Sequence, residues 1–414
     1  MSKGRPLVKP SHGEDWEGDR QERMLMEEGR PDRVLVIIVA VLVFTGVLMI
    51  YSSTSVITYA MQKKQITTPL FYFKRHVLTI FLALGAGYAA YKAKPGVLGK
   101  YSPLLLVGSM GLLLLVFTRF GISAGGARRW IRLWPSTFQP SELVKLSMVI
   151  FLAWYLSRDF FRPEKPLHVY LPVCIMAVFA AVFLKQPDFG GTLTLAFITI
   201  SMLFLAGSRL RYLGVLVLSF LPAIYYLAHK PYRWRRITSF LNPWACARGE
   251  GFQLVQSLIA FGRGGLWGVG LGKSMQKLSF LPEMHTDFIF SIIGEEMGFI
   301  RAGLVVAAFC FLFLRSVRVA NRVNGKYNYL LAYGIALMIA LPAIVNFCVV
   351  TGLLPTKGLP LPFISYGGSS LIVNMMAVGI LLRLSKGEPP RQVKDGLKEI
   401  IEKKKARRHV YGVS

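Results

Sequence analysis

Five ionisable side chains gather in one short stretch, Phe280 to Glu296, which reads FLPEMHTDFIFSIIGEE. They are Glu283, His285, Asp287, Glu295 and Glu296. The stretch opens an apolar run, so these groups lie where a chain would pass from water into lipid. Charged groups at that depth are costly, and they are usually retained for function. The stretch is therefore the first candidate for catalysis.

Asp287 can serve two purposes at this place in the chain. A carboxylate can take a proton from a reacting hydroxyl group. If a helix begins near Thr286, then Asp287, Ser291 and Glu295 share one of its faces. An aspartate at a helix N-terminus also caps free N–H groups and complements the helix dipole. Residue types alone leave the catalytic role and the capping role both open.

A second group of candidate functional residues lies where another apolar run begins. Glu142 and Lys145 are three residues apart and follow Pro140, which suits the first turn of a helix. They can pair on one helix face, either to neutralise each other in the membrane or to serve a site beside Asp287. Trp130 fits an interfacial aromatic belt or a stacking wall for a sugar.

Several short motifs suggest other chemistries but lack the necessary context. Residues 261–272, FGRGGLWGVGLG, match neither a dinucleotide fingerprint nor a P-loop, and they favour a flexible or closely packed loop. Ser274 and Lys277 fit the Ser-x-x-Lys motif of penicillin-binding enzymes, yet the companion Lys-Thr/Ser-Gly is absent. The four cysteines are scattered, and no HExxH, CxxC or Cys/His spacing indicates a metal site.

The composition is that of a polytopic membrane protein. Of 414 residues, 53% are hydrophobic and only 17% are charged, too few charges for a soluble protein of this size. The net charge of +28 could suggest nucleic acid as a partner. The basic residues instead lie between apolar runs, and no nucleic-acid-binding motif accompanies them. We therefore exclude nucleic acid as a partner.

The apolar runs predict an all-α fold of about ten transmembrane helices, each near the ~20 residues that a bilayer requires. The predicted spans are 34–53, 71–93, 102–120, 141–157, 168–184, 190–207, 212–229, 288–314, 328–352 and 369–384. A large external loop separates the seventh and eighth helices. Residues 1–33 form a flexible cytoplasmic tail, and residues 386–414 form a basic cytoplasmic tail.

Lysine and arginine in the short loops predict the orientation. The basic loops after helices two, four, six and eight fall on the same side as both tails, so both termini are predicted to be cytoplasmic. The opposite side also carries many basic residues, including Arg75, Arg128, Arg129 and Arg132. Such a surface suits a phosphate-bearing ligand or anionic lipid headgroups.

Four external segments rich in Pro, Gly and Trp suggest a single pocket on that side. They are residues 124–142, 185–191, 242–244 and 353–370. Non-helical backbone near membrane depth is tolerated where it lines a cavity. Two functions fit such a pocket: an enzyme acting on a phosphorylated lipid, or a transporter of that lipid. The unusual residues cluster at one face rather than at mid-membrane, which favours the enzyme.

The motifs, taken together, resemble the SEDS family (shape, elongation, division and sporulation), the FtsW/RodA peptidoglycan glycosyltransferases. The matching stretches include FQPSELVKLS, KQPDFGGTL, NPW, GFQLVQSLIAFGRGGLWGVGLG, LPEMHTDFIFSIIGEEMGF and GLLPTKGLPLPFISYGGSS. They follow the family order over residues 75–385, and Thr356-Lys357-Gly358 with NPW resembles the division branch. A sporulation or elongation member of the family remains the alternative.

The resemblance implies a SEDS-type transmembrane glycosyltransferase domain over residues 34–385. Its implied activity is polymerisation of lipid II into glycan strands at the outer face of the inner membrane, for septal wall synthesis. A lipid II flippase is the alternative. The resemblance makes Asp287 the essential carboxylate. It also implies that substrate is bound by Arg75, Trp130, Glu142, Lys145 and Lys357.

The resemblance also implies partners and a location. The expected partners are a class B penicillin-binding transpeptidase and other membrane proteins of the division complex, and the expected location is the septal inner membrane. No cofactor or metal is required by the sequence. A divalent cation is compatible with departure of a diphosphate, and the carboxylates alone do not establish one.

Overall fold

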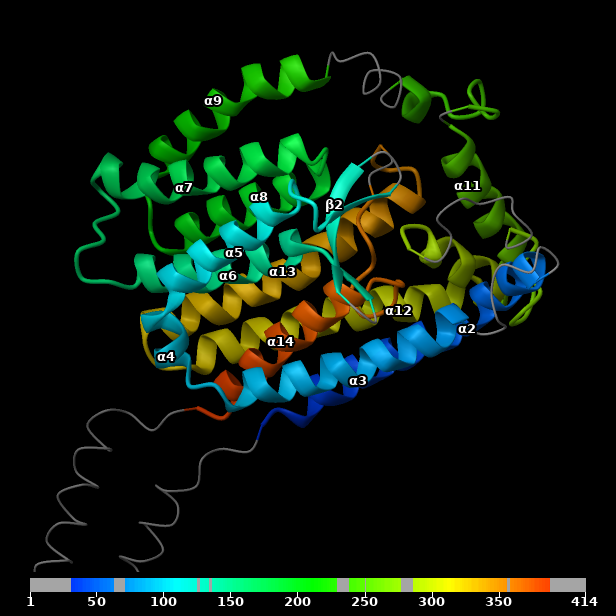
Figure 1. Ribbon diagram of the computed structural model, residues 1–414, viewed down its shortest axis with the longest axis horizontal. Coiled ribbons are helices and arrows are strands. Elements are labelled where there is room, and N and C mark those ends of the chain that lie inside the picture. The colour runs from blue at the N-terminus through cyan, green and yellow to red at the C-terminus, as the bar shows by residue number, and fades with distance from the viewer. Residues whose placement is uncertain are drawn as a thin grey trace, which may run out of the picture.

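The computed structural model describes residues 31–62, 71–124, 127–133, 136–228, 238–249, 251–276, 286–355 and 358–387. Within these ranges the chain is a bundle of long helices with one small sheet (Figure 1). The terminal tails predicted at 1–33 and 386–414 lie almost wholly outside the described residues.

The helices of the first half begin with α2 and α3, and the sheet lies between α5 and α6 in the sequence. Their bounds are α2 Arg33–Gln62, α3 Phe71–Lys92, α4 Pro95–Lys100, α5 Ser102–Leu115, α6 Pro140–Leu156, α7 Pro166–Lys185, α8 Phe189–Leu205 and α9 Leu210–Ala228. The second half contains α11 Phe252–Gly264, α12 Ile289–Arg322, α13 Lys326–Val350 and α14 Gly368–Ser385.

Five of the described helices are long and apolar enough to cross a membrane. These spans are Arg33–Ser53, Pro166–Lys185, Ile289–Arg322, Lys326–Val350 and Gly368–Ser385. Three further apolar helices are shorter, at Ser102–Leu115, Phe189–Leu205 and Leu210–Ser219. Each of the ten predicted apolar segments contains a helix, and the chain is a mostly helical, multi-pass membrane protein.

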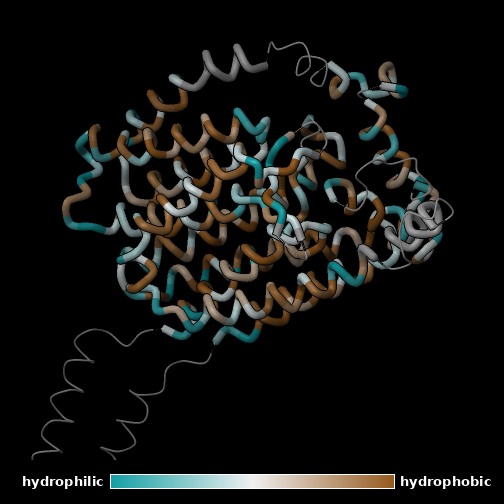
Figure 2. The backbone as a smooth tube through the Cα atoms, viewed as in Figure 1, coloured by the Kyte–Doolittle hydropathy of each residue, from teal (hydrophilic) through white to brown (hydrophobic). Residues whose placement is uncertain are grey.

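Apolar residues predominate along the helices of the bundle (Figure 2), and large apolar side chains are found both exposed and buried. Phe81, Leu104 and Val107 are each more than 60% exposed, whereas Leu42 and Met49 are buried in the core. A helix that is apolar all round requires an apolar surrounding on its outer side. The exposed faces are therefore the lipid-facing surface of the bundle.

Helix α6 and helix α13 form much of the bundle's interior, and nearly every residue of α6 is buried. On another side of the bundle, α3 and α14 pack together through small residues. A Cβ added to Gly379 would lie 2.1 Å from the carbonyl oxygen of Gly87. Small residues allow this close approach between membrane helices, where packing rather than the hydrophobic effect drives association.

The external segments contain structure that the all-α expectation missed. Strands β1 (Gly121–Ala124), β2 (Ala127–Leu133) and β3 (Ser136–Phe138) form an antiparallel sheet in the order β1-β2-β3. Their short length and lack of regular alternation concealed them in the sequence. The predicted large loop between α9 and α12 contains α11, so it is partly helical.

The glycine-rich run 261–272 begins in the last turn of α11 and continues as a closely packed loop, one of the two interpretations that the sequence favoured. Gly268 has a φ of 85°, and its N–H donates to the Gly264 carbonyl at 2.7 Å. A Cβ at Gly268 would lie 2.3 Å from the Glu296 carbonyl oxygen. Helix α12 is interrupted beside it at Gly298, whose φ is 80°.

Gly268→Ala should destabilise the protein by at least about 2 kcal/mol, because the added methyl group meets backbone and the φ is unfavourable for alanine. Gly262→Ala is the matched control, since Gly262 lies in α11 with open space around it. There alanine should be neutral or stabilising by up to about 1 kcal/mol. Thermal unfolding in detergent measures both, and equal melting temperatures would contradict the packing described here.

Candidate functional site

Asp287 lies in a turn immediately before α12, and its backbone is held by a buried asparagine of α13. Phe288 occupies the N-cap position of α12, so Asp287 lies one residue before the usual capping position. The Asn346 side chain, 2% exposed, donates to the Asp287 carbonyl at 2.7 Å and to the Leu359 carbonyl at 2.8 Å. One amide group therefore joins the turn before α12 to the segment before α14.

A serine makes a second link between the same two segments. The Ser365 hydroxyl donates to the Thr286 carbonyl at 2.5 Å and accepts the Leu361 N–H at 2.7 Å. The Asp287 carboxylate lies against the same segment, because a Cβ at Gly358 would be 2.8 Å from its Oδ2 atom. The carboxylate is thus placed by contacts on both sides of residue 287.

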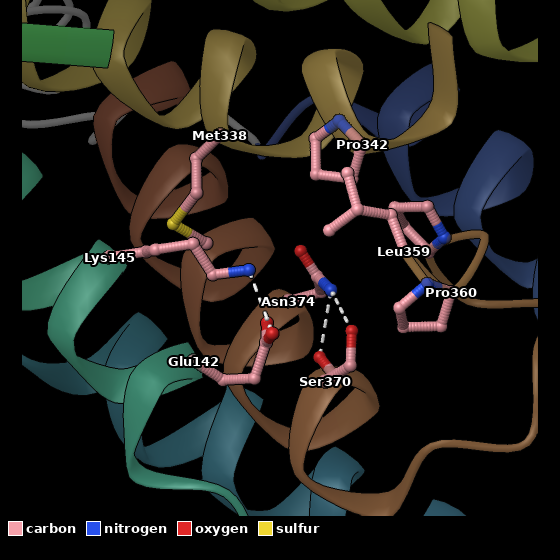
Figure 3. A pocket seen from close by; sticks show the side chains of 9 residues that line it. Glu142, Lys145, Met338, Pro342, Leu359, Pro360, Ser370 and Asn374 are labelled. Carbon is pink, nitrogen blue, oxygen red and sulfur yellow. Dashed lines mark hydrogen bonds and ion pairs between the residues drawn. The ribbon is translucent and has the colours of Figure 1, made fainter. Parts of the chain in front are cut away.

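Glu142 and Lys145 form a buried ion pair in the first turns of α6. Lys145 Nζ lies 2.8 Å from Glu142 Oε1, and the two residues are 4% and 7% exposed. The pair lines a small pocket with residues of α13, α14 and the segment between them (Figure 3). The other lining residues are Met338, Pro342, Leu359, Pro360, Pro362, Ser370 and Asn374.

The pocket and Asp287 are connected through one residue, Leu359. Leu359 lines the pocket, and its carbonyl accepts from the asparagine that also holds Asp287. Asn374, which also lines the pocket, donates to the Ser370 carbonyl at 2.8 Å and to the Ser370 hydroxyl at 3.1 Å (Figure 3). The structure therefore brings Asp287, Glu142 and Lys145 to one region, on either side of residues 358–362.

Two of the other external motifs pack against this region. In the motif 185–191, the Asp188 side chain accepts the Gly191 N–H at 2.9 Å and so caps α8. A Cβ at the intervening Gly190 would meet the Leu359 side chain at 2.7 Å. The start of α6 is tied to α14, since Gln139 N–H donates to the Ser369 hydroxyl at 2.8 Å. The NPW motif contributes no lining residue, and its Trp244 is 60% exposed.

Arg75 and Trp130 are half-buried and do not line the pocket. Arg75 lies in α3, and its buried Nε atom has no hydrogen-bond partner among the described residues. Its neighbour His76 packs against Tyr366 with ring centroids 6.0 Å apart, which places this part of α3 beside residues 363–367. Trp130 lies in β2 opposite Ile122. Lys357, Glu283 and His285 lie outside the described residues.

Glu295 and Glu296 have a structural role, and both are fully buried. Glu295 accepts from the Ser274 hydroxyl and from the Met275 N–H, and Arg263 lies 3.7 Å from it. Glu296 accepts the Gly272 N–H at 3.0 Å and the Ser52 hydroxyl at 2.9 Å. The two carboxylates hold the loop 265–276 onto α12. The prediction that Asp287, Ser291 and Glu295 share one helix face was wrong, because α12 begins only at Ile289 and Glu295 faces the loop 265–276.

Sequence reasoning missed Asn346 and Ser365, the two side chains that hold the Asp287 turn. An asparagine deep within an apolar run was the available signal for Asn346, since a polar group in a membrane helix needs a partner. No comparable signal marked Ser365. Among the described residues, no three His, Cys, Asp or Glu side chains group as metal ligands would. The arrangement offers one positioned carboxylate and, nearby, one buried ammonium group.

Comparison with known proteins shows which family the chain matches. The family model FTSW_RODA_SPOVE, described as "Cell cycle protein", matches residues 32–389. A protein of Geobacter sp. strain M18, "Probable peptidoglycan glycosyltransferase FtsW", is 44% identical over 358 residues, covering 86% of this chain and 96% of the relative. A Coxiella burnetii protein of the same name is 42% identical over 360 residues, with the same coverage.

Two solved structures share the fold. One chain, from "Structural coordination of polymerization and crosslinking by a peptidoglycan synthase complex", is 30% identical with a TM-score of 0.71. The match covers 86% of this chain and 97% of that one. The rod shape determining protein RodA of Thermus thermophilus is 28% identical with a TM-score of 0.63. That match covers 86% of this chain and 96% of RodA.

Lys145→Met should destabilise the protein by about 3–5 kcal/mol, because it leaves the buried Glu142 carboxylate without its cation. Adding Glu142→Gln should recover most of that loss, since the unpaired charge is then removed. Thermal unfolding of both variants in detergent measures the difference. A Lys145→Met protein that melts like the wild type would mean that the pair is not buried as described.

Proposed function

Because the chain belongs to the family of FtsW, RodA and SpoVE cell-cycle proteins, we propose that it is a peptidoglycan glycosyltransferase of septal cell-wall synthesis. The observation that carries the activity is the identity of 40–44% to six relatives named as probable FtsW enzymes, over 86–88% of this chain. In this function the protein joins lipid II units into glycan strands.

The reaction transfers a growing glycan from its polyprenyl diphosphate carrier to a hydroxyl group of lipid II. The acceptor oxygen forms a bond to the anomeric carbon of the donor, and the bond from that carbon to the diphosphate breaks. The acceptor proton goes to a base, and the diphosphate leaves with the bonding electrons. The protein must therefore supply a base and positive charge for the leaving group.

Asp287 is the base in this proposal. Its support is the fixed turn before α12, in which Asn346 and Ser365 hold the backbone on either side and Gly358 leaves room for the carboxylate. A base that is held in place loses less conformational freedom when the acceptor binds. Positioned proton transfer contributes about 10²–10⁴-fold to rate.

Lys145 supplies positive charge near Asp287, and Glu142 holds that ammonium group in place. A lysine ammonium has three N–H donors, and the contact of Lys145 with Glu142 uses one of them. Arg75 and Lys357 are assigned to the diphosphate, and Trp130 to the sugar face, by resemblance to the family. A half-buried arginine with an unpartnered Nε suits a phosphate ligand, because arginine binds phosphate through several N–H groups.

The proposed setting is a ten-helix protein of the bacterial inner membrane, with both termini in the cytoplasm and the active site outside. In the structure, the start of α2 and the end of α14 lie together, at the opposite end of the bundle from α11 (Figure 1). The proposed partners are a class B penicillin-binding transpeptidase and other division proteins. The likeness to a chain of a synthase complex that coordinates polymerisation with crosslinking supports the first.

Asp287→Asn should abolish or nearly abolish strand synthesis while leaving the fold intact. The amide has the shape of the carboxylate, but it accepts no proton at neutral pH. The measurement is glycan polymer formed from lipid II in detergent, with a catalytically inactive partner transpeptidase added. Polymer formed by the wild-type protein also distinguishes an enzyme from a flippase. Detergent micelles do not separate two compartments, so a protein that only transports lipid II would give no product there.

The controls for Asp287→Asn are Glu283→Gln and His285→Ala, which remove the two nearest rival bases in the sequence. Both should retain more activity than Asp287→Asn. Near-normal polymerisation by a well-folded Asp287→Asn protein would move the base elsewhere without overturning the activity. Lipid II transport without any polymer from the wild-type protein would overturn the activity itself.

The proposed orientation predicts how cysteines react in intact spheroplasts. Cys246 is exposed in the segment between α9 and α11, so a membrane-impermeant maleimide should label it from outside. Cys174 and Cys310 lie on lipid-facing positions of helices and should not react. A cysteine at the exposed Asp159, introduced with Cys246→Ala, should react only after permeabilisation. The reverse pattern would invert the orientation.

A further inference from the structure

A second pocket lies at the end of the bundle that carries both termini, away from the Asp287 site. It is formed where the start of α2, the last turns of α12 and the end of α14 meet (Figure 1). Its lining combines three arginines with apolar side chains and one acid. The lining residues are Asp32, Arg315, Arg318, Val319, Arg322, Val323, Leu384, Ser385 and Gly387.

The single acid of this pocket already has its partners. Arg315 Nε lies 2.6 Å from Asp32 Oδ2, and both side chains are largely buried. The other carboxylate oxygen accepts the Val34 and Leu35 N–H groups at 3.0 and 3.3 Å, which caps the start of α2. The Asp32 N–H donates to the Ser385 hydroxyl at 3.0 Å. Asp32 is therefore used for joining α2, α12 and α14.

The two remaining arginines, Arg318 and Arg322, are exposed and make no hydrogen bond or ion pair with any described residue. They lie four residues apart on α12, so their side chains share one face of the helix. Like charges at this spacing repel each other. An anion placed between them would remove that repulsion and satisfy both guanidinium groups.

The rest of the lining indicates what carries the anion. Val319 lies between the two arginines in sequence and is buried, and Val323 and Leu384 also line the pocket. These residues belong to the ends of two membrane-spanning helices, so the pocket lies at the boundary between lipid and water. A free phosphate ion gains nothing from an apolar wall. A phospholipid places its phosphate and its acyl chains on the two sides of that boundary.

We propose that this pocket binds one anionic phospholipid, whose phosphate lies between Arg318 and Arg322 and whose acyl chains lie along α12 and α14. Arginine pairs bidentately with phosphate, and basic pockets between membrane helices are suited to anionic headgroups. The bound lipid would fasten the last turns of α12 beside the Asp32–Arg315 pair. This site is independent of the glycosyltransferase activity and of the proposed orientation.

The test compares phosphatidylglycerol with phosphatidylcholine of the same acyl chains, added to the full-length protein in detergent. Native mass spectrometry counts the lipids that remain bound during a titration. We expect the wild-type protein to retain one phosphatidylglycerol in preference to phosphatidylcholine. Arg318→Gln with Arg322→Gln should weaken that binding at least about tenfold, because each basic residue near a headgroup contributes measurably.

The matched control is Arg209→Gln with Arg211→Gln, which removes the same charge from two exposed positions at the start of α9, outside the pocket. Its phosphatidylglycerol binding should stay within about twofold of the wild type. Arg318→Lys with Arg322→Lys keeps the charge and should bind at an intermediate level, because lysine lacks the bidentate geometry. Melting temperatures establish that each variant is folded.

Three outcomes would overturn the proposal. They are equal retention of the two lipids, an equal loss in the control pair, and binding of glycerophosphoglycerol as tight as that of the whole lipid. The last would assign the pocket to a soluble phosphate compound, since glycerophosphoglycerol has the headgroup and no acyl chains.

Discussion

The structure around Asp287 depends on one constraint: backbone carbonyls that leave a helix near membrane depth must still receive hydrogen bonds. Two irregular segments face this constraint here, the turn before α12 and residues 358–367 before α14. Lipid offers them no donors, and an unsatisfied group there costs several kcal/mol. Asn346 supplies both N–H groups of its amide, one to Asp287 and one to Leu359. The candidate base is thus positioned by the same bonds that make the irregular backbone tolerable.

The ionisable residues of the stretch 280–296 divide between two different tasks. Glu295 and Glu296 point to the loop 265–276 and accept its N–H and hydroxyl groups, so their charges are offset locally. That loop closes over α12 because glycines at 264 and 268 allow backbone to approach backbone. Asp287 lies on the other side, against Gly358. The first turns of α12 therefore carry a rigid anchor on one side and a candidate reactive group on the other.

The sequence predicted the helices well because long apolar runs in a membrane can satisfy their backbone only as helices. It predicted their ends less well. The eighth run was expected to stop at 314 with its last apolar residue, yet α12 continues to Arg322. Its arginines extend a helix into water without breaking it. Asp287, Glu142 and Lys145 were found by their cost in lipid, but Asn346 was missed because its partners are 59 and 13 residues away.

Stability does not explain the pair of Glu142 and Lys145. Replacing a buried ion pair with apolar residues of similar volume is often neutral or stabilising by about 1–4 kcal/mol. The surroundings of this pair are largely apolar, with Met338, Pro342 and Leu359 in the same pocket, so an apolar substitute would fit them. A charge kept there at a net cost needs a use. In the proposed reaction a diphosphate develops charge beside the segment that Asp287 also touches. A lysine ammonium group held in place by a glutamate meets that charge without first reorganising.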